Sequence, residues 1–291
     1  MERLDAVIRL LSADDLDEAF GLSTVAGWNQ RLADWRMLLQ LAPAGSFAAV
    51  ADARIIGTAI GIDYGAFGWI AMMLVDPGWR GRGVGARLLE SAMAALPPGT
   101  PIRLDATPLG RLLYRRYGFE DEAALTRHVA EASRRRVDPS PAVESRRVRG
   151  LERADLSAVI AEDDRIFGAH RRILFEWALG DAEQYAHLIE TDAGANYCFG
   201  RPGRLFDQIG PVVAADDGGA QALVSASLRA AEARAVVVDA FDRHAGFTGW
   251  LRSRGFSAAR PLFRMCRGAW AGNGQGHRGL SERAILGPEF G

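Results

Sequence analysis

Residues 76–85 read Asp-Pro-Gly-Trp-Arg-Gly-Arg-Gly-Val-Gly, and this stretch decides the fold. It separates an apolar run, Trp69–Val75, from a segment with apolar residues at helical spacing, Val84–Leu96. Alternating glycines let successive backbone N–H groups point into one concavity, and the following helix adds its positive end. Arg80 and Arg82 add guanidinium groups that suit phosphate oxygens. The stretch is therefore predicted to bind a pyrophosphate.

Two other phosphate motifs do not fit this stretch. A Walker A loop needs a Gly-Lys-Ser/Thr ending, and the chain contains no lysine. A dinucleotide-binding fingerprint has a third glycine where Ala86 stands, and the strand before the motif lies too late in the chain. The structural alternative is a tight turn that only uses glycine for its backbone freedom.

The sequence around the motif predicts an α/β fold with a mixed sheet. The runs Phe47–Ala51 and Ile55–Ile60 flank Asp52 and Ala53 and indicate a hairpin. Ile102–Ala106 is a short apolar run that indicates a buried strand. Leu113–Phe119 indicates a helix that ends at a glycine and enters a strand.

The landmarks of the first half recur in the second half in the same order, which indicates a duplication. The clearest pairs are Asp-Leu at 15–16 and 155–156, Asp-Ala at 105–106 and 239–240, and Gly-Phe at 118–119 and 255–256. Chance matching of short apolar words is the alternative. We predict one domain over residues 1–131, a linker rich in proline and arginine over 132–147, and a second domain over 148–291. The stretch Ala271–Arg283 is rich in glycine and is expected to be a loop.

The composition of the chain argues against several classes of function. The chain has 291 residues, a net charge of -1, 48% hydrophobic residues and 35 basic residues, all arginine, against 36 acidic ones. This balance argues against nucleic-acid binding. We expect a cytoplasmic protein, because no apolar run is long enough for a membrane span and the N-terminus lacks a signal-peptide core. The two cysteines allow one disulfide at most, and the five scattered histidines show no metal-ligand spacing.

The sequence resembles the GCN5-related N-acetyltransferase (GNAT) superfamily. The acyl-CoA loop of that family, Arg/Gln-x-x-Gly-x-Gly/Ala, matches residues 80–85, and its Tyr-x-x-x-Gly-Phe pattern matches Tyr114–Phe119. The resemblance implies acetyl-CoA as co-substrate, no metal, and a strand that opens to pair with the pantetheine arm. It implies that the cofactor-binding residues are Met73, Leu74, Val75, Arg80, Gly81, Arg82, Gly83, Val84, Gly85 and Thr107, the last standing where the family has an asparagine.

The chemistry that the resemblance implies is acyl transfer to an amine by direct attack. The family tyrosine that protonates the leaving thiolate matches Tyr114, which could instead be a packed aromatic. Asp105 is a candidate general base, although Asp239 stands at the matching place in the second half and favours a structural role; an ordered water chain could also serve. Trp28 and Asn29 lie where relatives contact their substrate, and simple packing is the alternative.

The second half looks like a degenerate copy of the first. With Gly210–Val212, Arg264–Met265 and the closing Gly287–Gly291, it resembles the C-terminal domain of a bacterial tandem acetyltransferase group similar to YitH. Leu251 stands at the place of Tyr114, and Asp216 and Asp217 stand where the phosphate loop is expected. Two carboxylates repel a pyrophosphate. We therefore predict one active site, in the first half, where a primary amine of a small molecule is acetylated. We expect no nucleic-acid partner and no membrane partner. The alternative is an acyl-CoA-binding regulatory protein without significant turnover.

Overall fold

The computed structural model describes residues 6–136, 146–191, 194–231, 233–269 and 281–291. The helices and strands of the first half are β1 (Val7–Leu10), α1 (Leu16–Val25), α2 (Leu32–Leu41), β2 (Ser46–Ala51), β3 (Arg54–Asp63), β4 (Gly68–Val75), α3 (Val84–Ala94), β5 (Ile102–Ala106), α4 (Pro108–Arg116) and β6 (Glu120–Ala130). Those of the second half are β7 (Arg149–Gly150), α6 (Leu156–Phe167), α7 (Arg172–Asp181), β8 (His187–Thr191), β9 (Gly194–Arg201), β10 (Asp207–Ala214), α8 (Asp217–Ala230), β11 (Val236–Phe241), α9 (Ala245–Ser253), β12 (Ser257–Arg267) and β13 (Ser281–Ala284).

The predicted mixed α/β architecture is confirmed. The strands of the described residues form one sheet in the order β1-β2-β3-β4-β5-β12-β6-β11-β13-β10-β9-β8-β7. Asp52 and Ala53 form the β2–β3 turn with positive φ angles of 51° and 58°, as a tight hairpin requires. The predicted helix after the glycine-rich stretch is α3, whose buried side is apolar.

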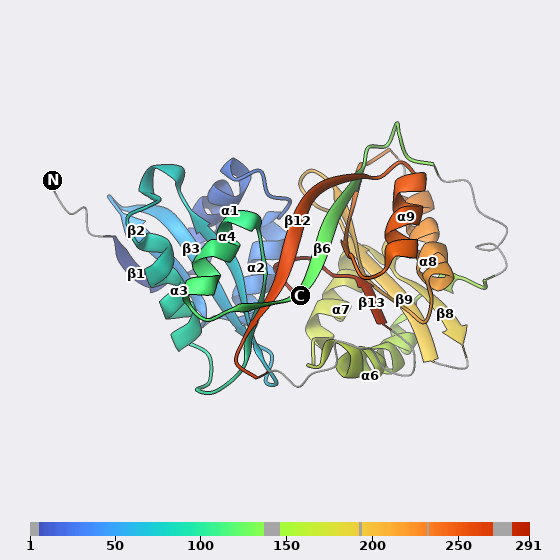
Figure 1. Cartoon of the computed structure of the whole chain (residues 1–291), viewed down its shortest axis with the longest axis horizontal. Helices are drawn as coiled ribbons and strands as arrows, with labels where there is room; N and C mark the ends of the chain where they lie inside the picture. The colour runs from blue at the N-terminus through green and yellow to red at the C-terminus, as the bar shows by residue number, and fades with distance from the viewer. Residues whose placement is uncertain (1–5, 137–145, 192–193, 232, 270–280) are drawn as a thin grey trace.

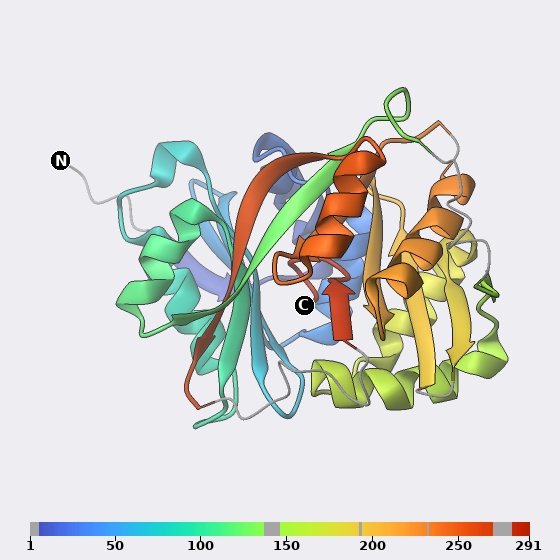
Figure 2. The ribbon, with the colours of Figure 1, turned by 45° about the vertical axis from the view of Figure 1, so that its right-hand side comes forward.

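Each half packs helices on both faces of its part of the sheet (Figures 1 and 2). In the first half, α1 and α2 cover one face and α3 and α4 the other, with Trp35 and Leu88 fully buried on opposite faces. In the second half, α6 and α7 cover one face and α8 and α9 the other. No helix among the described residues is long and apolar enough to cross a bilayer.

The two halves exchange their long strands at the centre of the sheet. β12 comes from the second half but pairs with β5 of the first, and β6 comes from the first half but pairs with β11 of the second. β6 and β12 also pair with each other along most of their length, and they cross the middle of the molecule side by side (Figure 1). The sequence predicted two successive domains, whereas the sheet mixes strands from both halves at their junction.

The exchange repeats the same ion pair on both sides of the junction. Arg264 of β12 lies opposite Asp105 of β5, and Arg127 of β6 lies opposite Asp239 of β11. Both oxygens of each carboxylate accept from one guanidinium, at 2.9 Å for Asp105 and at 2.6–2.7 Å for Asp239. The side chains of all four residues are at most 10% exposed. Each half therefore supplies the counter-ion for the other.

Most of the predicted linker, residues 137–145, lies outside the described residues, as do residues 271–280 of the predicted C-terminal loop. The end of that loop is a strand, however: Ser281–Arg283 belong to β13. The prediction was wrong there because pairing with β10 and β11, which lie far away in sequence, determines this conformation.

Candidate active site

A cavity of about 610 Å³ opens where β4 and β5 separate. These parallel strands pair only at Gly68–Ile102 and Trp69–Arg103, and they diverge towards their C-terminal ends. The opening lies among β4, α4, the α1–α2 connection, β12 and the last residues of the chain. The lining residues are Ala26, Trp28, Gln30, Ile70, Ala71, Met72, Met73, Leu74, Val75, Arg80, Gly81, Asp105, Thr107, Leu109, Gly110, Leu112, Leu113, Tyr114, Arg116, Arg260, Leu262, Pro288 and Glu289.

The glycine-rich stretch connects the end of β4 to the start of α3 beside this cavity. Gly81 and Gly83 have φ angles of +74° and +82°, and a Cβ atom at either position would meet no other atom within 4 Å. The first N–H groups of α3 have no intrahelical acceptor, so they are available to an anion. Arg80 Nε donates to the Val75 carbonyl oxygen at 3.0 Å, which ties this arginine to the strand end. The loop therefore has the backbone geometry of an anion-binding site.

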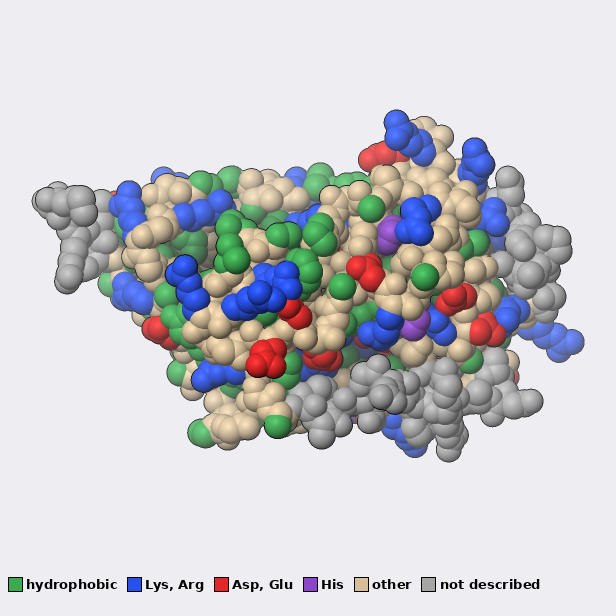
Figure 3. All heavy atoms as spheres, viewed as in Figure 1, with side chains coloured by type: hydrophobic (Ala, Val, Ile, Leu, Met, Phe, Trp, Pro, Cys, Tyr) green, Lys and Arg blue, Asp and Glu red, His purple; other side chains and the backbone are tan. Residues whose placement is uncertain are grey.

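Arginine side chains also gather around this loop. Arg82 lies over the Trp79 ring, 5.1 Å from its centroid. On the face drawn in Figure 3, basic side chains lie over α3 and α4 with acidic ones beside them, and Arg111 and Arg115 both pair with Asp121.

Tyr114 lies on α4 and lines the cavity. Its ring packs edge-to-face on Phe119, with the centroids 5.8 Å apart. Burial raises the pKa of the Tyr114 hydroxyl, which therefore stays protonated at neutral pH. Thr107 begins the same helix, and its Oγ1 accepts from Gly110 N at 3.2 Å. Both predicted residues therefore line the same cavity as the phosphate loop.

Asp105 lines the cavity, but Arg264 occupies both of its oxygens. Burial raises the pKa of Asp105, and the charge of Arg264 acts in the opposite direction. The repeat of this ion pair by Asp239 and Arg127 fits the structural role that the sequence left open. The role of general base stays a prediction.

The two residues expected at the acceptor pocket have different positions. Trp28 lines the cavity, but Asn29 does not. The Asn29 amide instead bonds the second half: its Oδ1 accepts from Leu205 N and Phe206 N, and its Nδ2 donates to Phe206 O, at 2.9–3.0 Å. Asn29 therefore joins the halves, a contact that no local sequence pattern indicates.

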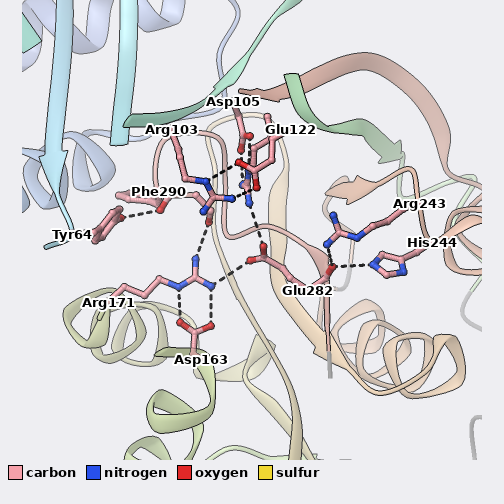
Figure 4. A network of polar contacts seen from close by, with 12 residues as sticks. Tyr64, Arg103, Asp105, Glu122, Asp163, Arg171, Arg243, His244, Glu282 and Phe290 are labelled. Carbon is pink, nitrogen blue, oxygen red and sulfur yellow. Dashed lines mark hydrogen bonds and ion pairs between the residues drawn. The ribbon is translucent and has the colours of Figure 1, made fainter. Parts of the chain in front are cut away.

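The last residues of the chain lie beside the cavity, where a buried polar network between the two halves holds them in place (Figure 4). Tyr64 OH donates to Phe290 O at 2.8 Å, and Trp69 Nε1 donates to Pro288 O at 3.1 Å. Arg171 donates to Gly291 O and to both oxygens of Asp163. The side chains of Asp163 and Arg171 are both completely buried.

The equivalent opening in the second half is filled by the chain itself. β10 and β11 pair at Asp207–Val236 and Gln208–Val237 and then diverge, as β4 and β5 do. β13 lies in the gap: Ala284 is opposite Val212 of β10 and Ala240 of β11. In Figure 2, β13 is the short red strand in the part of the sheet that belongs to the second half. A pantetheine arm cannot pair with strands that β13 already occupies.

The expected phosphate loop of the second half is also closed. Asp216 caps α8 by accepting from Gly219 N at 2.7 Å, and its other oxygen accepts from Arg146. Asp217 pairs with Arg283 of β13 at 2.8 Å. Leu251, at the place of Tyr114, is fully buried.

Comparison with known proteins matches both halves. Models of an acetyltransferase (GNAT) domain match residues 43–121 and residues 159–277. This chain is a tandem-domain member of the GNAT superfamily. No curated protein sequence matches this GNAT chain. In Pyrococcus horikoshii, a putative acetyltransferase is 19% identical with a TM-score of 0.76, covering 100% of this chain and 98% of its own.

Two further solved structures share the tandem GNAT fold. A GCN5-related N-acetyltransferase from Sphaerobacter thermophilus is 17% identical, with a TM-score of 0.64 over 90% of this chain and 95% of its own. A tandem GNAT protein from the clavulanic acid biosynthesis pathway is 14% identical, with a TM-score of 0.62 over 90% and 98%. At these identities the likeness concerns the fold alone. The resemblance of the second half to the YitH group stays a prediction.

Gln30, Arg260 and Glu289 are among the cavity residues to which the sequence analysis gave no role. Gln30 directly follows Trp28 and Asn29, so that stretch was a usable signal. Arg260 and Glu289 belong to the second half, and only the strand exchange and the path of the last residues bring them to the first. Among the described residues, no group of histidine, cysteine, aspartate and glutamate side chains could hold a metal ion.

Proposed function

We propose that this GNAT protein is an acetyl-CoA-dependent N-acetyltransferase that acetylates a primary amine of a small molecule. We place its one active site in the first half. The observation that carries the proposal is the contrast between the two strand openings. The β4–β5 opening is a cavity beside the glycine-rich loop, whereas β13 fills the β10–β11 opening.

The cavity divides into a donor side and an acceptor side. In the proposal, the N–H groups of residues 81–85 and the guanidinium of Arg82 hold the diphosphate of CoA. The backbone groups of Met73, Leu74 and Val75, freed where β4 leaves β5, pair with the pantetheine arm. The acceptor enters beside Trp28, which places its amine near the thioester and the Tyr114 hydroxyl.

The proposed reaction is a direct attack of the amine on the thioester carbonyl carbon. The new C–N bond forms, the C–S bond breaks, and the thiolate takes a proton from Tyr114. The attacking nitrogen must lose a proton, either to Asp105 or to water in the cavity. Water needs no rearrangement, whereas Asp105 must first release one oxygen from Arg264. The amide and the free thiol of CoA are the products.

The test is release of free thiol from acetyl-CoA with a panel of small amines, together with calorimetry. We expect amine-dependent thiol release and a stoichiometry of one CoA per chain. Two equivalent sites would contradict the placement of the site in the first half.

One observation favours the regulatory alternative: both carboxylates that line the cavity, Asp105 and Glu289, are bound to arginines. In that case CoA binds once, but no amine releases thiol. The same two measurements therefore separate the two functions.

A further inference from the structure

Three polar side chains line the acceptor side of the cavity and lack partners for buried atoms. Gln30 Oε1, Arg260 Nε and Glu289 Oε2 are buried and accept or donate no hydrogen bond. Buried polar atoms normally have a hydrogen-bond partner. Three such atoms around one cavity therefore point to a polar ligand. They come from the α1–α2 connection, from β12 and from the last residues of the chain.

Arg260 forms no ion pair within the part of the chain that the structure describes, although the charges of Asp239 and Glu289 act on it from farther away. The residue opposite Arg260 on β6 is Arg127, whose charge Asp239 already neutralises. Burial, with the charge of Arg127 as a second cause, lowers the pKa of Arg260 to about 10, so it is still charged at neutral pH.

The pseudo-symmetry of the exchanged strands shows that Arg260 is specific to the open cavity. Arg264 of β12 corresponds to Arg127 of β6, since each binds the aspartate of the other half. Four residues earlier, β12 carries Arg260 and β6 carries Ala123. The arginine is therefore present on the strand that faces the open cavity and absent from the one that does not.

Glu289 supplies the opposite charge. Its Oε1 accepts from Arg201, which also pairs with Asp34. Arg201 is thus shared between two carboxylates, and the charge of this trio is negative when both are ionised. Glu289 is only 3% exposed, yet it lines the cavity. The acceptor side of the cavity therefore presents one cation from β12 and one anion from the last residues.

We propose that the acceptor is a carboxylate-bearing primary amine of the amino-acid type, whose carboxylate binds Arg260 and whose amine faces Glu289 and Gln30. This inference rests on the proposed function. A single guanidinium binds a carboxylate with two parallel hydrogen bonds and one neutralised charge. A phosphate carries more charge than one arginine neutralises, and Glu289 would repel it. The product is an N-acetylated amino acid, with protons and bonds transferred as described above.

The experiment compares matched amine pairs in wild-type protein and variants. Each pair is an amino acid and its decarboxylated amine, such as phenylalanine with phenylethylamine and alanine with ethylamine. We expect wild-type protein to favour the carboxylated member, and Arg260→Gln to lower its kcat/KM by about tenfold to a hundredfold, which corresponds to a charged hydrogen bond. The decarboxylated member should change little. Arg260→Lys should restore part of the preference.

Control variants and measurements separate a specific effect on carboxylate binding from a general loss of activity or folding. Arg267→Gln changes an exposed arginine on the same strand and should leave both members unchanged. Glu289→Gln should lower kcat/KM for both members of a pair equally, because it acts on the amine. The melting temperature and CoA affinity of each variant show that it is folded. A shift in wild-type melting temperature with phenylalanine, but not with phenylethylamine, in the presence of CoA is a readout that needs no turnover.

Two failures are distinguishable. If no amine releases thiol but phenylalanine still shifts the melting temperature through Arg260, the catalytic proposal fails and the ligand class stands. If wild-type protein uses amines without a carboxylate, or phosphorylated amines, as well as or better than amino acids, the inference is wrong and acetyl transfer stands.

Discussion

Tyr114 has surroundings that suit proton donation. It is 7% exposed, its ring is held by Phe119, and its hydroxyl has no hydrogen-bond partner within the described residues. Asp105, by contrast, is held by Arg264 with both oxygens. At the scale of single residues, the cavity is therefore lined by a hydroxyl that is free to donate and by a carboxylate whose two oxygens are both bound to Arg264.

Tyr114→Phe removes the hydroxyl and keeps the ring. Because loss of a general acid typically costs ~10²–10⁴-fold in rate, we expect kcat to fall by that order while CoA affinity stays nearly unchanged. Thiol-release kinetics with calorimetry for CoA measure the two quantities. Tyr117→Phe is a matched control, since that hydroxyl bonds Glu90 at the surface. Unchanged turnover in Tyr114→Phe shows that water protonates the thiolate.

Half-buried His187 makes stability depend on pH. Burial lowers its pKa from 6.5 to about 4. The unfolded chain therefore takes up a proton at a higher pH than the folded one, so stability is complete above pH 6.5 and falls as the pH drops towards 4. After a discount for partial exposure, we expect a loss of about 1–2 kcal/mol from this group.

Urea unfolding at pH 7 and pH 4.5 tests the His187 prediction. His187→Gln should lose less stability between the two pH values than wild-type protein does. His170→Gln, at an exposed histidine, should keep the wild-type difference. An unchanged difference in His187→Gln would contradict the assignment.

At the scale of elements, one strand opening is a cavity and the other is filled by the chain itself. The loop between β4 and α3 has two glycines with positive φ at the phosphate position, and β13 fills the gap between β10 and β11. The gap between two diverging parallel strands is thus open in the first half and filled in the second. A single substitution can test each gap.

Gly83→Glu places a carboxylate and a side chain at the start of α3, where the diphosphate is proposed to bind. A negative charge at a phosphate site and strain at a φ of +82° both act against binding. We expect calorimetry to show no CoA binding. Gly99→Glu, at another exposed turn with a φ of +80°, introduces the same charge and strain away from the loop and should still bind CoA.

Gly210→Ala tests the occupied opening. A Cβ atom at this position would lie 1.9 Å from the Ile285 carbonyl oxygen, just after β13. Such overpacking costs about 1–3 kcal/mol. We expect a lower melting temperature, with Gly180→Ala as control because that helical position has open space. A melting temperature equal to that of wild-type protein would show that β13 can leave the gap at no cost.

At the scale of the whole molecule, the halves depend on each other. β12 completes the sheet beside β5, β6 joins β11, and each exchanged strand carries the arginine for the aspartate of the other half. Pro288 and Glu289 also reach the cavity of the first half from the second. The second half thus forms part of the proposed acceptor site.

A split chain tests this dependence. Residues 1–140 and 141–291, expressed together as separate polypeptides, should copurify and bind one CoA, because the exchanged strands hold them together. Residues 1–140 expressed alone should be insoluble or melt at a lower temperature, since β5 and β6 then lack β12 between them. A soluble, equally stable and fully active fragment shows that the second half is dispensable.

The sequence alone determined the local features of this protein. Glycine and arginine spacing at residues 80–85 indicated the loop, because it depends on backbone conformations that few residues adopt. Apolar periodicity indicated α3 and the β2–β3 hairpin, because each buries side chains at regular intervals. The lost motifs at Asp216 and Leu251 indicated that the second half differs in function.

Only the tertiary structure decided what joins the halves. The exchange of β6 and β12, the insertion of β13 and the approach of Arg260 and Glu289 to the cavity all depend on pairing between residues far apart in sequence. A strand pattern shows which side chains are buried but not which strand lies beside it, since the backbone hydrogen bonds are alike for every partner. For the same reason the polar acceptor residues could not be found from spacing, although the phosphate loop could.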